Sequence, residues 1–268
     1  MASDGLPHQV RSAGLLMRLS AMAAEAAAER GGGRSALPEL HADFSLNVAN
    51  SEAARAFLKL GVVRLAPTFD LNAIQIMELS AALAPHERDR LEVIVHTNVP
   101  IFHTEHCVFA RRLSDGNSYK DCGHPCTRHS LHLVDEQQHR HTVLADSGCR
   151  NTVFNAQPQS AAPYVGQLLD AGVRHLRVEL TDQPGALVGP LLERYASLAR
   201  GDETPERLLE WLGANLVDST GYKPGVTTGS YRPKAERAIA SLRPTSAELR
   251  ANAKRDDSQR TRDRENSW

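Results

Sequence analysis

Short extended segments alternate along this chain with longer segments of helical periodicity, and this alternation limits the fold more than any other feature. Apolar and β-branched patterns predict strands at residues 8–12, 41–48, 62–68, 91–99 and 175–180. Helical patterns and capping residues predict helices at residues 15–30, 49–61, 70–84, 160–172, 184–201 and 204–213. Strands that are connected through helices usually run parallel in one sheet, so the chain is predicted to be an α/β protein.

The number of strand–helix units is smaller than a closed barrel requires. A (β/α)8 barrel needs eight units and typically about 250 residues. The chain has 268 residues, but it gives one stretch to a segment rich in cysteine and histidine and another to a polar C-terminal part. We therefore expect a partial (β/α)8 TIM-like barrel, with a small open sheet as the alternative.

The sequence divides into four predicted parts. Residues 1–35 form an N-terminal strand and helix, and residues 36–215 form the α/β barrel portion, with a cysteine-rich insert at 100–155. Residues 216–244 are predicted to be a C-terminal loop with a short helix, and residues 245–268 a disordered, charged tail. Within the insert, two alternating runs on either side of "DEQQ" predict a β-hairpin over 130–146.

Charge and hydropathy exclude several protein classes. The formal net charge is −1, so the chain as a whole presents no basic field for nucleic acid, although a local basic face stays open. No apolar run approaches the roughly 18 residues that would predict a membrane span. The N-terminus lacks the pattern of an export signal, so we expect a cytoplasmic or organellar interior, not secretion. The thiols would then meet a reducing environment.

All four cysteines lie in one region of the chain. Cys107, Cys122, Cys126 and Cys149 follow the spacing C-x14-C-x3-C-x22-C, and eight of the twelve histidines lie between His96 and His141. Disulfides are disfavoured in a reducing compartment, and buried unligated thiols are common. A zinc site with four cysteine ligands and an iron–sulfur cluster both use four thiolates. The spacing alone leaves these four interpretations open.

Several blocks of the sequence, in their order and spacing, resemble the peptidase U32 family of collagenase-like proteases. The blocks are "HADFSLNVANSEAARAFLKLGVVRLAPTFDL", "VIVHTNVPIFHTEHCVF", "KDCGHPC" followed by "LHLVD", "VLADSGCRNTVFNA" and "AGVRHLRVEL". The resemblance extends over about residues 7–200. It implies a (β/α)8 barrel with the cysteine-bearing region inserted late in the barrel.

The resemblance also implies a cofactor and two classes of activity. Members of this family were first described as peptidases, and several carry a [4Fe–4S] cluster and take part in oxygen-independent hydroxylation of RNA bases or of a quinone precursor. By this resemblance the cluster ligands are Cys107, Cys122, Cys126 and Cys149, with zinc as the alternative metal. The expected substrates are therefore RNA, a quinone precursor or a peptide.

Candidate substrate-contacting residues lie where predicted strands end, because barrel enzymes carry their active sites at that face. His96 follows an apolar strand, with a structural hydrogen-bonding role as the alternative. Asp43 and Asn47 alternate along the predicted strand 41–48 and are expected to share a face. Arg177 and Glu179 lie on the last strand, where a packed ion pair is an equally good interpretation.

The chain departs from the family pattern in three respects. Residues 8–20 resemble a middle strand and its helix, so the first part of the barrel is predicted to be absent and a partner subunit could complete it. Asp70 stands where many members have Glu, and Thr228 stands where the family has Arg. The chain also lacks the H-E-x-x-H and G-x-S-x-G motifs of characterised peptidases. We therefore favour an iron–sulfur hydroxylation protein, with a peptidase as first alternative and a non-catalytic zinc or Fe–S module as second.

Overall fold

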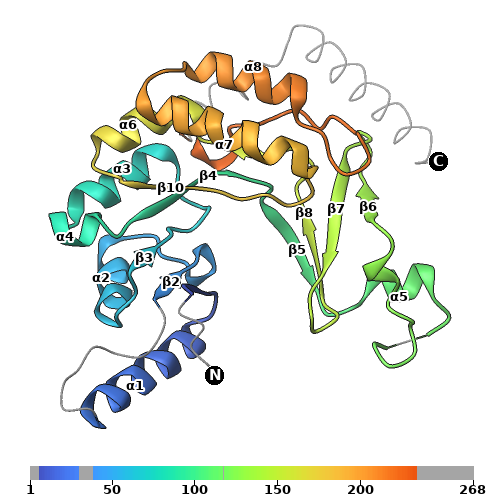
Figure 1. The fold of residues 1–268 in the computed structure, drawn as a ribbon, viewed down its shortest axis with the longest axis horizontal. Helices are drawn as coiled ribbons and strands as arrows, with labels where there is room; N and C mark the ends of the chain where they lie inside the picture. The colour runs from blue at the N-terminus through green and yellow to red at the C-terminus, as the bar shows by residue number, and fades with distance from the viewer. Residues whose placement is uncertain (1–5, 30–38, 117, 234–268) are drawn as a thin grey trace, which may run out of the picture. The chain divides into compact units, whose positions relative to one another are not determined.

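Five parallel strands lie side by side in the order in which they occur along the chain (Figure 1). The first sheet pairs β1 (His8–Val10), β2 (Leu40–Ala42) and β3 (Arg64–Leu65), and the second pairs β4 (Glu92–Thr97) with β10 (His175–Val178). A parallel bridge between Leu65 and Leu91 links β3 to the residue that precedes β4. The predicted α/β fold class is therefore confirmed.

The computed structural model describes residues 6–29, 39–116 and 118–233. The chain as far as Tyr231 forms one compact unit, and only Arg232 and Pro233 of the second unit are described. The predicted tail at 245–268 and most of the segment 216–244 beyond Tyr231 lie outside the described residues. None of the described helices is long and apolar enough to cross a membrane.

Helices connect the parallel strands, as the sequence predicted. They are α1 (Ala13–Glu29), α2 (Ser51–Lys59), α3 (Ala73–Ala82), α4 (Pro85–Arg88), α6 (Val165–Asp170), α7 (Gly185–Arg200) and α8 (Pro205–Asn215). Side-chain caps fix several N-termini: the Asn50 side chain accepts from the Ala53 amide, and Thr204 accepts from Arg207. Helix α3 begins with a capping box between Asn72 and Gln75, two residues after the predicted Asp70 cap.

The main core lies between the parallel strands and the helices that pack against them. Every residue of β4 is buried, as expected for a strand covered on both faces. Val93 and Val95 of this strand pack in one cluster with Leu168 of α6 and Leu191 of α7. Burying a side chain of this size contributes roughly 1.5–3 kcal/mol, so this cluster is a main source of stability.

The insert forms a separate antiparallel sheet with the strand order β5-β8-β7-β6 (Figure 1). Its strands are β5 (Pro100–Thr104), β6 (Leu131–Val134), β7 (Arg140–Ala145) and β8 (Asn151–Phe154), and α5 (Val108–Leu113) follows β5. The predicted hairpin is confirmed as β6 and β7, with Leu131 opposite Val143. A small core of Phe109, Val143 and Val153 lies under this sheet.

All five strand predictions were longer than the observed strands, and two of them were much too long. Strand β2 ends at Ala42, and the chain then turns through a 3-10 helix (Phe44–Leu46) to Asn47, whose φ of 57° is left-handed. Asp43 is buried and Asn47 is exposed, so the expectation that they share a strand face was wrong. Strand β3 likewise covers only Arg64–Leu65 of the predicted 62–68.

The strands do not close into a ring within the described residues. They form three sheets, and β1 and β10 each have one strand neighbour. The remaining strand, β9 (Gln159–Ser160), pairs antiparallel with the end of β4. The observed fold is therefore a mixed α/β arrangement of three sheets without a closed barrel.

Candidate functional site

The four thiols come from three separate segments of the insert. Cys107 is the residue before α5, and Cys149 lies in the turn between β7 and β8. Cys122 and Cys126 lie on either side of the start of a short 3-10 helix (Pro125–Thr127). All four are half-buried, and none forms a disulfide. Burial, together with the nearby thiols of Cys107, Cys122 and Cys126, raises the pKa of Cys149, so the four side chains share one environment.

Amide groups point at the sulfur of Cys107. Its Sγ accepts from the backbone N–H of Ala110 at 3.5 Å and from Asn151 Nδ2 at 3.9 Å. Asn151 is fully buried, and its Oδ1 accepts from the Val108 amide at 2.6 Å. The side chain of Asn151 thus links the first residue of β8 to the segment that carries Cys107. Donors to a sulfur ligand tune a bound metal centre.

The turns that carry the other thiols depend on special backbone conformations. Gly123 and His124 both have positive φ, at 66° and 50°, and Cys149 itself has φ of 60°. Gly116 lies so close to the following turn that a Cβ there would come within 2.5 Å of the Asp121 carbonyl carbon. Local geometry therefore fixes where Cys122, Cys126 and Cys149 sit, independently of any bound group.

Four thiolates in one region of the chain suit two kinds of metal centre. A zinc ion binds four thiolates at about 2.3 Å in a tetrahedron, and an iron–sulfur cluster also takes four cysteine ligands. The donor set of Cys107, Cys122, Cys126 and Cys149 therefore fits either centre.

A second feature is a pocket of about 400 Å³ at the carboxyl ends of the parallel strands. Its lining includes residues that follow β1, β2, β4 and β10, together with Leu144 and Phe154 of the insert sheet. Three predicted site residues meet there: Asp43, Arg177 and Glu179. This position is the usual one for an active site in parallel α/β proteins.

Arg177 holds the acidic groups of this pocket together. Its Nη2 lies 2.5 Å from Asp43 Oδ1 and 3.1 Å from Glu179 Oε1, and its Nη1 lies 3.7 Å from Glu92. The Nε of Arg177 is buried and has no hydrogen-bond partner among the described residues. The guanidinium therefore keeps one donor that is not used within the network.

Glu179 is the most perturbed acid of this pocket. Burial raises the pKa of Glu179, and the Arg177 charge and a hydrogen bond from Thr97 oppose that rise. The hydroxyl of Thr97 donates to Glu179 Oε2 at 2.8 Å. A carboxyl group with a raised pKa, facing a pocket, is suited to exchange a proton with a bound molecule.

Two predicted site residues lie elsewhere. His96 is fully buried, and its Nδ1 lies 3.1 Å from the Tyr195 hydroxyl, which in turn lies 2.7 Å from Ser160 Oγ. Burial lowers the pKa of His96 to about 4, so the ring is neutral at physiological pH. Neither His96 nor Asn47 lines the pocket. This geometry fits the structural alternative for His96.

Sequence reasoning missed two members of this pocket. Arg11 follows β1, contacts Asp43 Oδ2 at 2.9 Å and lies 5.1 Å from the centroid of the Phe44 ring. Thr97 ends β4 and orients Glu179. Both positions follow the same rule that singled out Asp43, because each lies at the carboxyl end of a predicted strand.

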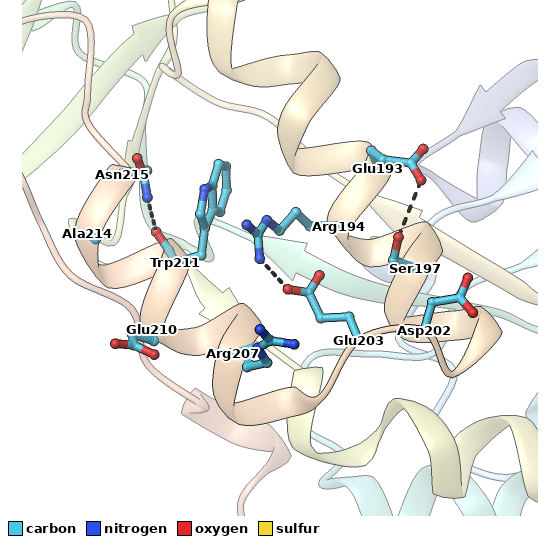
Figure 2. A pocket seen from close by; sticks show the side chains of 10 residues that line it. All are labelled: Glu193, Arg194, Ser197, Asp202, Glu203, Arg207, Glu210, Trp211, Ala214 and Asn215. Carbon is cyan, nitrogen blue, oxygen red and sulfur yellow. Dashed lines mark hydrogen bonds and ion pairs between the residues drawn. The ribbon is translucent and has the colours of Figure 1, made fainter.

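Another pocket, of about 570 Å³, lies between α7 and α8 (Figure 2). Several of its side chains already have partners: Arg194 binds Glu203 and stacks over Trp211, and Glu193 accepts from Ser197. It lies on the helices, away from the strand ends that carry the predicted site residues. We therefore place the candidate site at the strand ends and the thiols, not here.

Comparison with known proteins gives one match. The family model described as "Peptidase family U32" matches residues 34–201, which include all four cysteines and the pocket residues Asp43, Arg177 and Glu179. No curated protein and no solved structure matches the chain significantly.

Proposed function

The chain belongs to peptidase family U32, and from this premise we propose that Cys107, Cys122, Cys126 and Cys149 bind a [4Fe–4S] cluster. We further propose that the protein takes part in oxygen-independent hydroxylation of an RNA base or a small aromatic quinone precursor. The resemblance of the cysteine-bearing blocks to this family supports the proposal.

The observation that carries the proposal is the convergence of four thiols from three separate segments of the insert. The thiols of Cys107, Cys122 and Cys126 all lie near enough to Cys149 to raise its pKa. The donors at Cys107 and the apolar residues beside Cys107 and Cys126 add what such a cluster needs, namely amide dipoles and partial exclusion of water. When bound, a [4Fe–4S] cluster supplies one-electron redox chemistry.

The pocket at the strand ends is the proposed substrate site. A volume of about 400 Å³ suits a single aromatic ring with its substituents. Phe44 and Phe154 line this pocket and offer apolar surfaces to a planar ring, while the Arg177 side chain offers a positive charge to a polar substituent. Glu179 holds or accepts a proton at the bound ring, because its pKa is raised by burial.

For the fold we propose a portion of a (β/α)8 barrel. Parallel strands in unbroken chain order, each followed by a helix, are the arrangement of such a barrel, whereas a doubly wound sheet reverses its order. The observed order β1-β2-β3 continues through the Leu65–Leu91 bridge to β4 and β10. A partner subunit that adds strands beside β1 or β10 would complete the ring.

The peptidase alternative has less geometric support. A thiol peptidase needs a histidine in contact with its nucleophilic cysteine. Among the described residues, no histidine ring hydrogen-bonds to a cysteine sulfur; the sulfur contacts of Cys107 are with Ala110 and Asn151. Cleavage of gelatin or casein by the purified chain, abolished by a chelator and retained after Cys→Ala changes, would favour the peptidase.

The experiment is anaerobic purification followed by visible spectroscopy with iron and sulfide assays. We expect a brown protein with about four iron and four sulfide per chain, and loss of colour in Cys122→Ser and Cys149→Ser. Asp202→Asn, a change at an exposed acid, serves as the control and retains the colour. A colourless protein with one zinc ion per chain would rule the cluster out.

A further inference from the structure

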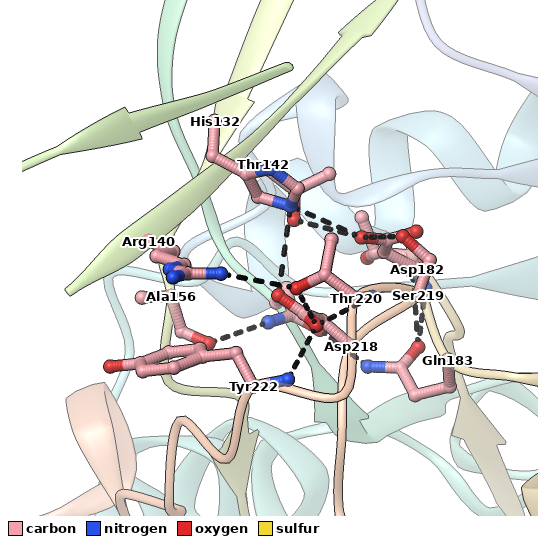
Figure 3. Close-up of polar contacts among 12 residues, drawn as sticks. His132, Arg140, Thr142, Ala156, Asp182, Gln183, Asp218, Ser219, Thr220 and Tyr222 are labelled. Atoms are coloured by element: carbon pink, nitrogen blue, oxygen red, sulfur yellow. Dashed lines mark hydrogen bonds and ion pairs between the residues drawn. The ribbon is translucent and has the colours of Figure 1, made fainter. Parts of the chain in front are cut away.

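Three side chains from distant segments meet beside the insert sheet. They are His132 on β6, Asp182 in the loop between β10 and α7, and Asp218 in the loop after α8. His132 Nε2 lies 3.5 Å from Asp182 Oδ2 and 3.6 Å from Asp218 Oδ2. Figure 3 shows the imidazole pointing at both carboxylates. One imidazole nitrogen and two carboxylate oxygens thus face one another across a shared space.

Two of these atoms are buried without a hydrogen bond. His132 Nε2 and Asp218 Oδ2 are inaccessible to solvent and have no hydrogen-bond partner among the described residues. The Asp218 side chain is only 10% exposed. A buried polar atom without a partner destabilises the folded chain, and more so when it is charged. Such atoms in a folded protein indicate a group that the protein chain itself does not supply.

The surrounding hydrogen bonds hold the free oxygen of Asp218 toward this space. Its other oxygen, Oδ1, accepts from the Thr220 amide at 2.8 Å, from the Thr220 hydroxyl at 2.6 Å and from the Tyr222 amide at 2.9 Å. On the opposite side, Asp182 Oδ2 accepts from the Thr142 and Ser219 hydroxyls. Metal ligands in proteins are typically oriented by an outer layer of this kind.

The distances match those around a single metal ion. Nitrogen and oxygen ligands lie about 2.1 Å from zinc, which places neighbouring ligand atoms about 3.4–3.6 Å apart at angles near 110–120°. The two separations from His132 Nε2 are 3.5 and 3.6 Å. A cavity of about 10 Å³, lined by Asp182 and Asp218 but not by His132, adjoins this group, and it is the size of a single water molecule. It is too small for an organic substrate.

We propose that His132, Asp182 and Asp218 bind a divalent first-row transition-metal ion, separate from the thiol site. One imidazole with two carboxylates suits Zn²⁺ or Mn²⁺, and water completes the coordination. The ion joins the insert hairpin to the loops that follow β10 and α8. It therefore fixes the insert sheet, three of whose residues (Pro100, Leu144 and Phe154) line the pocket at the strand ends. The proposal does not depend on the proposed hydroxylation.

The test uses Mn²⁺ as the probe, because thiolates bind this hard ion poorly. The full chain, purified anaerobically, is titrated with Mn²⁺, and free ion is followed by electron paramagnetic resonance. We expect one bound ion per chain and binding weakened at least tenfold in both Asp218→Asn and His132→Gln. Asp202→Asn and Cys122→Ser should bind as the unchanged protein does, because neither residue faces this site.

A second measurement covers the case in which a variant folds poorly. Mn²⁺ should raise the unfolding temperature of the unchanged chain but not that of Asp182→Asn, with circular dichroism recorded for every variant. Absence of saturable binding to the unchanged chain would overturn the proposal and leave a trapped water molecule as the occupant. Binding that is equal in the unchanged chain and in folded Asp218→Asn would overturn it as well.

Discussion

Arg177 Nη2 lies 2.5 Å from Asp43 Oδ1, although the two residues are 134 positions apart and are associated with strands of different sheets. The Asp43 side chain is 2% exposed and that of Arg177 is 18% exposed. The contact links the end of β2 to β10 across the pocket. A nearly buried ion pair of this kind is costly to break from one side, because the remaining charge loses its partner.

Replacing Arg177 by Met should lower the free energy of unfolding by about 3–5 kcal/mol, because Asp43, Glu92 and Glu179 would lose their shared cation. Arg11→Gln is the matched control, since Arg11 binds the same carboxylate but its side chain is 64% exposed. Its cost should stay below about 1 kcal/mol. Urea denaturation measures both, and equal losses would contradict a special role for Arg177.

Gly116→Ala should prevent cluster assembly. The added Cβ would come within 2.5 Å of the Asp121 carbonyl carbon and 2.7 Å of the Cys122 amide nitrogen, so the turn carrying Cys122 must move. Gly166→Ala in α6 is the control, because its Cβ would meet nothing within 4 Å. Iron content after anaerobic reconstitution gives the readout. Full iron loading of Gly116→Ala would show that the turn tolerates the displacement.

Asn151→Asp separates two roles of one buried side chain. The variant keeps an oxygen that can accept from the Val108 amide but replaces the donor to Cys107 Sγ with a negative charge. We expect the reduction potential of the reconstituted cluster to become more negative, since donors to the sulfurs raise it. Redox titration is the measurement, with Asn215→Asp on α8 as the control. An unchanged potential would mean that Asn151 only shapes the loop.

His96 predicts how stability depends on pH. Its pKa of about 4 in the folded chain lies below the ordinary 6.5, so the unfolded chain binds a proton first as the pH falls. The stabilisation from the neutral ring is complete above pH 6.5 and is lost between pH 6.5 and 4. The loss amounts to as much as about 3 kcal/mol. In His96→Leu the free energy of unfolding should depend less on pH between pH 6.5 and 4. An unchanged pH dependence would mean that other groups cause it.

The local sequence pattern predicted elements whose signal is confined to one segment. β4 is a buried, β-branched run, and α8 begins with Thr204 and Pro205, so both were recognised. The turn after β2 was not, because Asp43 and Asn47 fit an alternating strand as well as they fit a 3-10 helix followed by a left-handed residue. Alternation alone does not encode that choice.

The candidate site could be predicted only in part, because it depends on contacts between distant segments of the chain. Asp43, Arg177 and Glu179 were predicted as candidates because each stands at or near a strand end, and the three line one pocket. His96 satisfies the same rule, yet it packs against Tyr195, since a strand buried on both faces gives no sign of which face a residue occupies. His132, Asp182 and Asp218 lie in three separate segments, so only the folded chain brings them together.

The two residues through which the chain enters and leaves the insert lie next to each other. The amide of Asn155 donates to the carbonyl of Val99 at 2.8 Å, so the two ends of the segment already touch. An insertion closed in this way adds little loop entropy to the pairing of β4 with β10. Because its ends are so close, the insert could be removed by joining Val99 to Asn155 through a tight turn. It could also be replaced by a different segment without changing the α/β part.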